Sequence, residues 1–429
     1  MRILLPLILI LTSLGLALAD EPPLTLKAAV EYALAHNPDL LAARQDPASA
    51  AARLDAARAA GRLTASANAF LTAGTGGMIV AGANPVMPQY LSTQQVGRQG
   101  TLNGTAMYPL STGGRVQADK RQKAHELASA EELVRAAEND LALRVRASYK
   151  KAALADLIVG IYTQRVIETT ERLRVDQAKY DAGKIPLVFV LRDKAELADA
   201  QQSHTNAVRD LDIALLDLKQ SMGAPLAPKT TLADKLVYDP RTEDAEALAK
   251  EADAKRPELV AARARVSAAQ ESIISANSAY KPQLAVAGMG NLTSNSNVGR
   301  FGEYLVGLIA SVPLADGGLR GAQVHEAQAE ATKAQRELDA MRLNAEREVR
   351  VAFANLGAAD QNTRTSMEAV AQADEDHRVA KLRYDAGKGI LLEVLDSLTA
   401  LVRAQVNYSQ ALYEYSTAQD DLNRAAGRR

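Results

Sequence analysis

One pentapeptide, Tyr-Asp-Ala-Gly-Lys, occurs twice in this chain of 429 residues and limits the possible folds more than any other feature. The copies occupy residues 180–184 and 384–388, and each follows a long, alanine-rich, charged stretch without proline. A glycine just beyond a helical pattern is the usual left-handed end of a helix. Pro186 then suits the first turn of a following helix. Each copy therefore predicts a reversal between two helices.

The two turns belong to a longer internal repeat. Residues 109–223 align with residues 313–427 at a constant offset of 204, and the segment from Asn37 aligns with the segment from Arg256 at an offset of 219. The extra length of the first copy therefore lies in the glycine-rich, polar stretch 72–99. From this repeat we predict a first unit at 20–223, a linker at 224–243 and a second unit at 244–429.

Within each repeat the pattern predicts a short helix, two strands, a long helix, the turn and another short helix. The expected short helices cover about 25–61 and 245–280 before the strands, and about 187–222 and 390–426 after the turns. The long helices, 113–181 and 317–385, would each measure about 100 Å at 1.5 Å per residue. Because a helix of this length is not stable alone in water, we expect helices to lie side by side with coiled-coil-like seams.

The N-terminus has the pattern of a secretory signal peptide, residues 1–19. Arg2 precedes an apolar run at 3–18, and its last residues with Ala19 form a cleavage site before Asp20. The alternative is an N-terminal membrane anchor, which the short run disfavours. The chain contains no cysteine, so a lipid-modified N-terminal cysteine, disulfides and thiolate chemistry are excluded. Its formal net charge of −1 gives no electrostatic reason to expect nucleic acid as a partner.

The strand regions alternate between apolar and polar residues. The apolar set comprises Ala65, Ala67, Ala69, Leu102, Gly104, Ala106 and Tyr108 in repeat one, and Leu284, Val286, Gly288, Val306, Leu308, Ala310 and Val312 in repeat two. Strands of about 9–11 residues with one apolar face suit the wall of a transmembrane β-barrel; amphipathic hairpins on a soluble protein are the alternative. Four strands cannot close, and open edges are not tolerated in hydrocarbon. Several chains must therefore share one barrel.

Together these features resemble the TolC-like outer-membrane efflux protein family. The resemblance rests on the doubled unit behind a signal peptide, on Tyr-x-x-Gly at each turn, on Glu-Val-Leu-Asp-Ser-Leu after the second turn and on Pro-Leu-x-x-Gly-Gly at each strand-to-helix junction. The junction residues are Pro109, Gly113, Gly114, Pro313, Gly317 and Gly318. The resemblance implies a fold class that is mainly α with a small transmembrane β part: a duplicated helix–strand–strand–helix unit, a long α-helical barrel and a β-barrel shared between chains, with four strands per chain.

The same resemblance implies a homotrimer that forms a passive exit duct without cofactors. Its barrel would lie in the outer-membrane lipid of a Gram-negative-type bacterium, and its helical tunnel would cross the periplasm. The far end would dock a periplasmic adaptor protein that is fed by an inner-membrane transporter. The resemblance assigns the adaptor contact to the two turns, at Tyr180, Gly183, Lys184, Tyr384, Gly387 and Lys388.

The resemblance also assigns residues to the narrow periplasmic end of the duct. Glu393 and Asp396 occupy positions where the family places acidic residues around the lumen, and their spacing puts them on one helix face. The alternative is that both are carboxylates favoured by the start of a helix. Some family members close this end with an arginine and an aspartate, which are replaced here by Gly389 and Phe189. Phe189 supplies either an apolar constriction or an interhelical packing contact.

The sequence gives little support for catalysis or metal binding, so we expect no enzyme. His125-Glu126 resembles the start of an HExxH zinc motif, but Ser129 occupies the second histidine position. The acidic run 374–377, which ends in His377, is more typical of a solvated helix face than of a cation site.

A second function class is a periplasmic coiled-coil adaptor or scaffold. It would share the signal peptide and long helices, but it should have one hairpin flanked by small β domains. A duct devoted to type I protein secretion is a further alternative within the resemblance. The sequence leaves the cargo open between drugs, metal ions and proteins. The loop 72–99 is expected to face the cell exterior.

Overall fold

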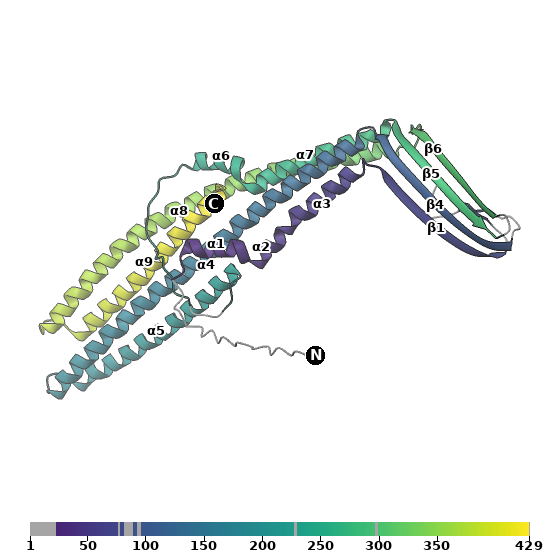
Figure 1. Cartoon of the computed structure of the whole chain (residues 1–429). Coiled ribbons are helices and arrows are strands. Elements are labelled where there is room, and N and C mark those ends of the chain that lie inside the picture. Colours follow the sequence, from purple (N-terminus) through teal and green to yellow (C-terminus); the bar gives the residue numbers. More distant parts are fainter. Residues whose placement is uncertain are drawn as a thin grey trace, which may run out of the picture. The chain divides into compact units, whose positions relative to one another are not determined.

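The computed structural model describes residues 23–75, 78–80, 89–91, 96–226, 230–296 and 299–428. The predicted signal peptide lies outside these residues. Within them the chain is mainly helical with a small β part, as predicted (Figure 1). The helices are α1 (Leu26–His36), α2 (Pro38–Ala43), α3 (Gln45–Ala59), α4 (Arg115–Asp181), α5 (Leu187–Met222), α6 (Ala245–Lys255), α7 (Pro257–Asn277), the 3₁₀ turn η1 (Ser278–Tyr280), α8 (Leu319–Asp385) and α9 (Leu391–Ala425).

The internal repeat is present in the backbone as well as in the sequence. Helices α4 and α8 each have 67 residues and end at positions 204 residues apart. Four glycines of repeat one with positive φ have counterparts with nearly the same φ at the same offset. The pairs are Gly113 and Gly317 (65° and 66°), Gly114 and Gly318 (95° and 94°), Gly183 and Gly387 (71° and 70°), and Gly223 and Gly427 (70° and 78°). Both long helices begin two residues later than predicted, because the paired glycines before them are not helical.

The prediction of one short helix before the strands of each repeat is wrong, because each of these segments contains several helices. Residues 25–61 form α1, α2 and α3, and residues 245–280 form α6, α7 and η1. The breaks fall at Asn37 and Arg256, whose ψ angles of 123° and 122° are extended rather than helical. Each of these residues precedes a proline, which disfavours the helical conformation and cannot donate a backbone hydrogen bond. The repeat therefore preserves the break as well as the helices.

The sheet contains four antiparallel strands in the order β1-β4-β5-β6. Their bounds are β1 Thr64–Thr75, β4 Val96–Ser111, β5 Gln283–Asn295 and β6 Gly299–Ser311. With 12 to 16 residues they are longer than predicted, because β1 and β4 extend into the expected loop 72–99. A separate pair, β2 (Met78–Val80) and β3 (Gln89–Leu91), also lies in that segment.

The strand register repeats with the sequence. Ala65 pairs with Ala106 in repeat one, and their equivalents Leu284 and Ala310 pair in repeat two. The predicted apolar residues share one face: Leu102 lies opposite Leu292, for example, and both are exposed in the single chain. Among the described strands, β1 pairs with β4 alone and β6 with β5 alone. The sheet therefore has two open edges and an exposed apolar face.

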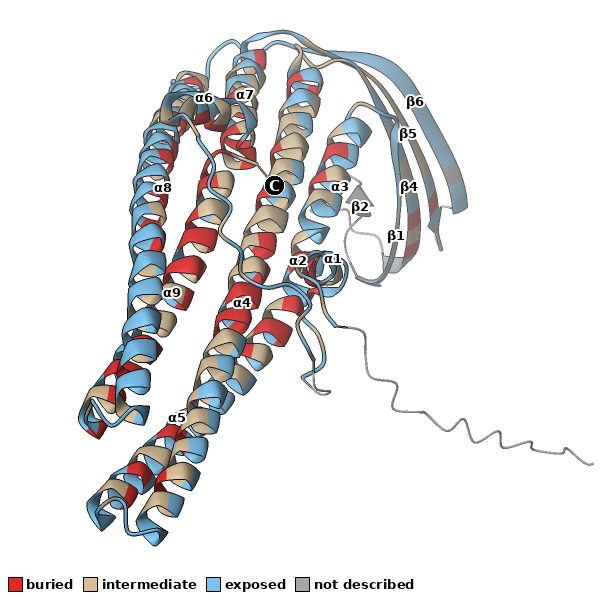
Figure 2. Ribbon diagram, turned by 90° about the vertical axis from the view of Figure 1, so that its left-hand side faces the viewer, coloured by how far each residue is buried: buried red, intermediate tan, exposed pale blue. Residues whose placement is uncertain are grey.

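The chain divides into two compact units that do not coincide with the two predicted repeats. One unit contains the described residues up to Asn37, Leu141–Arg241 and Asn355–Asp420; the other contains Pro38–Asp140, Thr242–Ala354 and the residues from Asp421. Each unit thus combines segments of both repeats. Figure 2 shows buried residues recurring along α9, whereas much of α8 is exposed.

The buried residues of each unit join distant parts of the sequence. In the first unit the Tyr149 hydroxyl donates to the Leu24 carbonyl at 2.7 Å and accepts from the Asp234 amide at 3.0 Å. In the second unit Leu259 and Val266 of α7 form an apolar cluster with Leu338 and Ala345 of α8. The linker and the N-terminal segment therefore help to fix α4.

Candidate functional site at the hairpin ends

The two predicted reversals have the same geometry. Gly183 and Gly387 adopt left-handed conformations, where a side chain would be strained. The Gly183 amide donates to the Tyr180 carbonyl at 2.8 Å, and the Lys184 amide donates to the Lys179 carbonyl at 2.8 Å. Gly387 and Lys388 make the equivalent bonds in repeat two. Both lysines are exposed at the ends of their hairpins.

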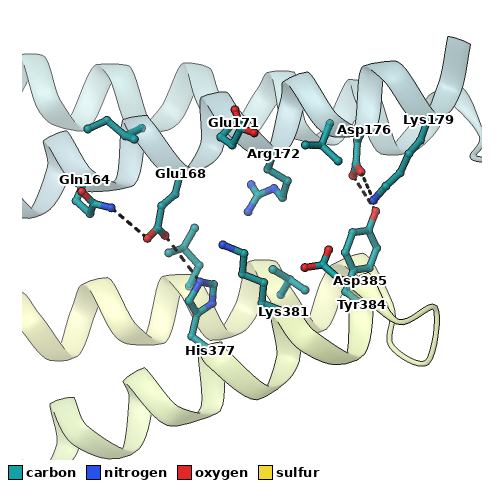
Figure 3. A pocket seen from close by; sticks show the side chains of 14 residues that line it. Gln164, Glu168, Glu171, Arg172, Asp176, Lys179, His377, Lys381, Tyr384 and Asp385 are labelled. Carbon is teal, nitrogen blue, oxygen red and sulfur yellow. Dashed lines mark hydrogen bonds and ion pairs between the residues drawn. The ribbon is translucent and has the colours of Figure 1, made fainter.

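A buried polar contact joins the hairpin α4–α5 to the hairpin α8–α9. The Tyr384 hydroxyl donates to Asp176 Oδ2 at 2.7 Å, and the ammonium of Lys179 donates to Asp176 Oδ1 at 3.0 Å (Figure 3). Lys179 Nζ also lies 4.8 Å from the centroid of the Tyr384 ring, a cation–π distance. Burial, followed by the bond to Asp176, raises the pKa of Tyr384. The hydroxyl therefore stays protonated and able to donate.

A second buried carboxylate lies next to this contact. The Arg172 Nε donates to Asp193 Oδ1 at 2.8 Å, so α4 is also tied to α5. Asp176 and Asp193 are both fully buried. Burial raises the pKa of Asp193; the Arg172 guanidinium acts in the opposite direction, and Asp176 adds to the rise. We call Arg172, Asp176, Lys179, Asp193 and Tyr384 the hairpin cluster.

His377 lies on the same side of α8, beside a cavity of about 440 Å³ between α4, α8 and α9 (Figure 3). Its Nδ1 is 3.0 Å from Ser397 Oγ, and its Nε2 is 3.8 Å from Glu168 Oε2. Burial lowers the pKa of His377, and Glu168 partly opposes this effect. The carboxylates of the run 374–376 are exposed, as predicted, but the prediction is wrong for His377, whose side chain is 12% exposed.

The three residues predicted for the narrow end lie beside the turns, at the starts of α5 and α9. Phe189 is partly buried in the first turn of α5, and Asp396 is exposed on α9. Glu393 Oε2 is 3.7 Å from Arg383 Nη1 across the second turn. Gly389 and Phe189 take no part in the Tyr384–Asp176 contact, so the polar link between hairpins comes from other positions. Whether these residues surround a passage depends on further copies and stays a prediction.

The strand-to-helix junctions end β4 and β6 and start the long helices. A register shift between Pro109 and Ser111 ends β4. The Thr112 hydroxyl then accepts from the Val116 amide at 3.2 Å, and at the equivalent place Asp316 accepts from the Gly318 and Arg320 amides at 3.1 and 2.9 Å. Both are helix-capping contacts.

The second junction carries an extra ion pair. Hydrogen bonds from Arg320, followed by the Gly318 amide, lower the pKa of Asp316 to about 2. The Arg320 Nη1 also donates to the Pro313 carbonyl at 2.9 Å. The start of α8 is therefore held to the end of the strand segment before it.

The two junctions differ in what covers their first glycine. A Cβ on Gly113 would lie 2.7 Å from the Ser278 carbonyl oxygen and 2.8 Å from Lys281 Cβ. A Cβ on Gly317 would meet no described atom within 4 Å. Equivalent positions of the two repeats thus have different surroundings within one chain.

The sequence does not single out the hairpin cluster. Asp176 and Tyr384 are 208 residues apart, and neither belongs to a motif that names the other. The one available signal for the cluster is that each Tyr-Asp-Ala-Gly-Lys turn begins with a tyrosine. In the structure these two tyrosines have different environments. Tyr180 makes no side-chain hydrogen bond to the described residues.

The family model described as "Outer membrane efflux protein" matches residues 29–224 and 248–428. The chain belongs to the outer membrane efflux protein family. Members of this family are efflux channels rather than enzymes, so the chain is not an enzyme.

Individual members of the family are distant relatives. Outer membrane protein TolC of Escherichia coli (strain K12) is 25% identical over 282 residues, which cover 62% of this chain and 57% of TolC. The match thus spans less than two thirds of that relative. The cobalt-zinc-cadmium resistance protein CzcC of Cupriavidus metallidurans is 24% identical over 413 residues, 95% of this chain and 90% of CzcC.

A solved structure supports the family fold. The outer membrane protein VceC of Vibrio cholerae superposes with a TM-score of 0.75 at 19% identity, over 94% of this chain and 96% of VceC. Among the described residues of the present chain, no helix is long and apolar enough to cross a membrane. The same residues hold no group of three or more metal-binding side chains.

Proposed function

We propose that this chain is one subunit of a passive exit duct, assembled from three copies in the outer membrane of a Gram-negative-type bacterium. The observation that carries the proposal is the four-stranded sheet, which has two open edges and an exposed apolar face. A sheet in hydrocarbon must have no unpaired edge. Strands from other copies would satisfy both edges, and the apolar face would contact outer-membrane lipid.

The internal repeat indicates which edges meet. Inside the chain, β4 of repeat one pairs with β5 of repeat two. The equivalent pair would join β6 to β1 of another copy. Gly104 of β4 pairs with Gly290 of β5. The equivalent of Gly104 at the offset of 204 is Leu308 in β6, and the equivalent of Gly290 at the offset of 219 is Leu71 in β1. Leu308 should therefore lie opposite Leu71 of that copy. Both leucines are largely exposed in the single chain, Leu71 at 90% and Leu308 at 75%, which supports a partner strand at each edge.

The surroundings of Gly317 and the exposure of α8 also support a neighbouring copy of the chain. Gly113 is covered by Ser278 and Lys281 of its own chain, and the equivalents of these two residues are Ala59 and Arg62. We infer that Ala59 and Arg62 of another copy cover Gly317. The exposure of the helices agrees: seven of the 26 residues 115–140 in α4 are exposed, against 17 of the 26 residues 319–344 in α8. Helix α8 thus lacks a neighbour that α4 has.

The hairpin ends would face an adaptor protein in the periplasm. Exposed apolar side chains gather there beside the turn lysines; they are Leu187, Val188, Leu191, Ile390 and Leu392. Exposed apolar groups with a polar surround are typical of protein contact sites. An adaptor bound here would connect the duct to an inner-membrane transporter, which would supply substrate and energy.

The mass of the detergent-extracted particle tests the proposal. We expect a trimer in washed outer membranes that forms conducting channels in planar bilayers. A folded, monodisperse monomer would contradict the shared sheet. Recovery of the chain in the periplasmic fraction would instead favour the adaptor or scaffold class.

A further inference from the structure

Arg383 and Glu393 face each other across the turn that joins α8 to α9. Arg383 Nη1 lies 3.7 Å from Glu393 Oε2, and the two side chains are 55% and 43% exposed. That carboxylate oxygen has no hydrogen-bond partner among the described residues. The arginine is therefore placed to offset the charge of the glutamate without a tight hydrogen bond.

The turn itself brings these two residues together. The amides of Lys388 and Gly389 both donate to the Arg383 carbonyl, at 2.8 and 3.0 Å. A Cβ on Gly389 would lie 3.2 Å from Arg383 Cβ and 3.1 Å from the Tyr384 nitrogen, closer than ordinary contact. The small residue at position 389 thus allows the start of α9 to approach the last turn of α8.

Repeat one has a cation at the equivalent position but uses it differently. Lys179, which is 204 residues before Arg383, donates to Asp176. The equivalents of Glu393 and Asp396 are Phe189 and Arg192. The turn of repeat two is therefore the one that places a cation opposite a helix-start carboxylate.

Asp396 differs from Glu393 in its surroundings. It is exposed on α9 and has no hydrogen bond or ion pair with any residue that the structure describes. The sequence pattern treats the two acidic residues alike. In the structure, the charge of Glu393 has a cation beside it, whereas the charge of Asp396 does not.

We propose that Arg383 determines the ion selectivity of the duct by neutralising Glu393, so that Asp396 supplies the uncompensated charge that favours cations. This inference rests on the proposed function, in which these residues line the water-filled narrow end. A unit charge about 7 Å from an ion in water changes the local ion concentration by about threefold. Because the Arg383–Glu393 pair carries no net charge, removing both charges should leave selectivity unchanged.

Reversal potentials in a KCl gradient across planar bilayers test the proposal, at low salt where screening is weak. The variants are R383Q, E393Q, the double variant R383Q/E393Q and D396N. We expect R383Q to raise the cation-to-anion permeability ratio at least threefold, because cations and anions respond in opposite directions and every copy loses one charge; E393Q and D396N should each lower the ratio by a similar factor. The double variant should retain the ratio of the parent. R378Q is the matched control, since Arg378 pairs with Glu375 within α8, away from the turn.

The outcomes separate the inference from the proposed function. If D396N lowers the ratio but R383Q changes nothing and the double variant behaves like E393Q, Arg383 does not act on the passage and the inference is wrong. If D396N and E393Q both conduct normally with the parental ratio, the carboxylates lie outside the water path, and the assignment of the narrow end fails. A parent chain that forms no channel overturns the proposed function and this inference together. The mass of each extracted particle shows whether the variants assemble.

Discussion

The hydroxyl of Tyr384 donates a 2.7 Å hydrogen bond to Asp176, which is fully buried on the other hairpin of its unit. Lys179 donates to the same carboxylate, so its charge is balanced locally. Hydrogen bonds to charged groups contribute about 1.5–3 kcal/mol. This contact is therefore a main polar connection between the two hairpins near their ends.

Replacing Tyr384 by phenylalanine should loosen that connection. Y384F removes the donor and leaves a buried carboxylate with one fewer partner, so we expect the hairpin ends to separate more often. In planar bilayers the mean conductance should rise relative to the parent. Y180F is the control, because the Tyr180 side chain makes no hydrogen bond to the described residues. Equal effects of Y180F and Y384F would show that the bond to Asp176 does not hold the hairpins.

His377 should make the stability of the first unit depend on pH. Its pKa is lowered by burial, so the unfolded chain binds a proton more readily than the folded chain. The contribution of neutral His377 to the free energy of unfolding is then fully present above the ordinary histidine pKa of about 6.5, and it falls as the pH drops below that value. The slope cannot exceed about 1.4 kcal/mol per pH unit for one proton.

Urea unfolding at pH 7.5 and 5.5 measures this dependence. The variant H377Q should show a smaller loss of stability between these two pH values than the parent. H204Q, which removes a histidine of α5 outside the cavity, should behave like the parent. An unchanged pH dependence in H377Q would mean that other groups cause the acid sensitivity.

Gly387 should be required by its backbone conformation. With φ at 70°, an alanine in its place would cost about 1–2 kcal/mol. Gly160 lies inside α4 with no described atom near its added Cβ, so G160A should stabilise the helix by about 0.5–1 kcal/mol. Thermal unfolding of the two variants should therefore shift in opposite directions. Stabilisation by G387A would be incompatible with the left-handed turn.

The sequence predicts the parts of the fold that depend on local signals or on duplication. The turns at Gly183 and Gly387, the long helices and the strand hairpins all follow from patterns that occur twice. The breaks at Asn37 and Arg256 also have a local sequence signal, because each of these residues precedes a proline. The helical periodicity on both sides hides that signal.

The hairpin cluster could not be predicted in the same way. Asp176 and Tyr384 come together through the packing of two helices far apart in sequence, and no local pattern encodes that packing. Gly389 illustrates a related difficulty. In the sequence, Gly389 stands only as a replacement of the arginine that some family members have at this position. In the structure, it makes room for Arg383 to approach Glu393.

The shared sheet is the central claim, and the cysteine-free chain allows a direct test of it. Opposite residues of antiparallel strands have Cα atoms about 4.5–5.5 Å apart, within the range that a disulfide spans. In the double variant L71C/L308C, oxidation of washed outer membranes should link β1 and β6 of neighbouring copies and yield a covalent trimer on a denaturing gel. The register control L71C/V306C should link poorly, and L308C alone should remain monomeric. A folded, membrane-bound L71C/L308C protein that stays monomeric after oxidation, or that links no better than the register control, would contradict the shared sheet.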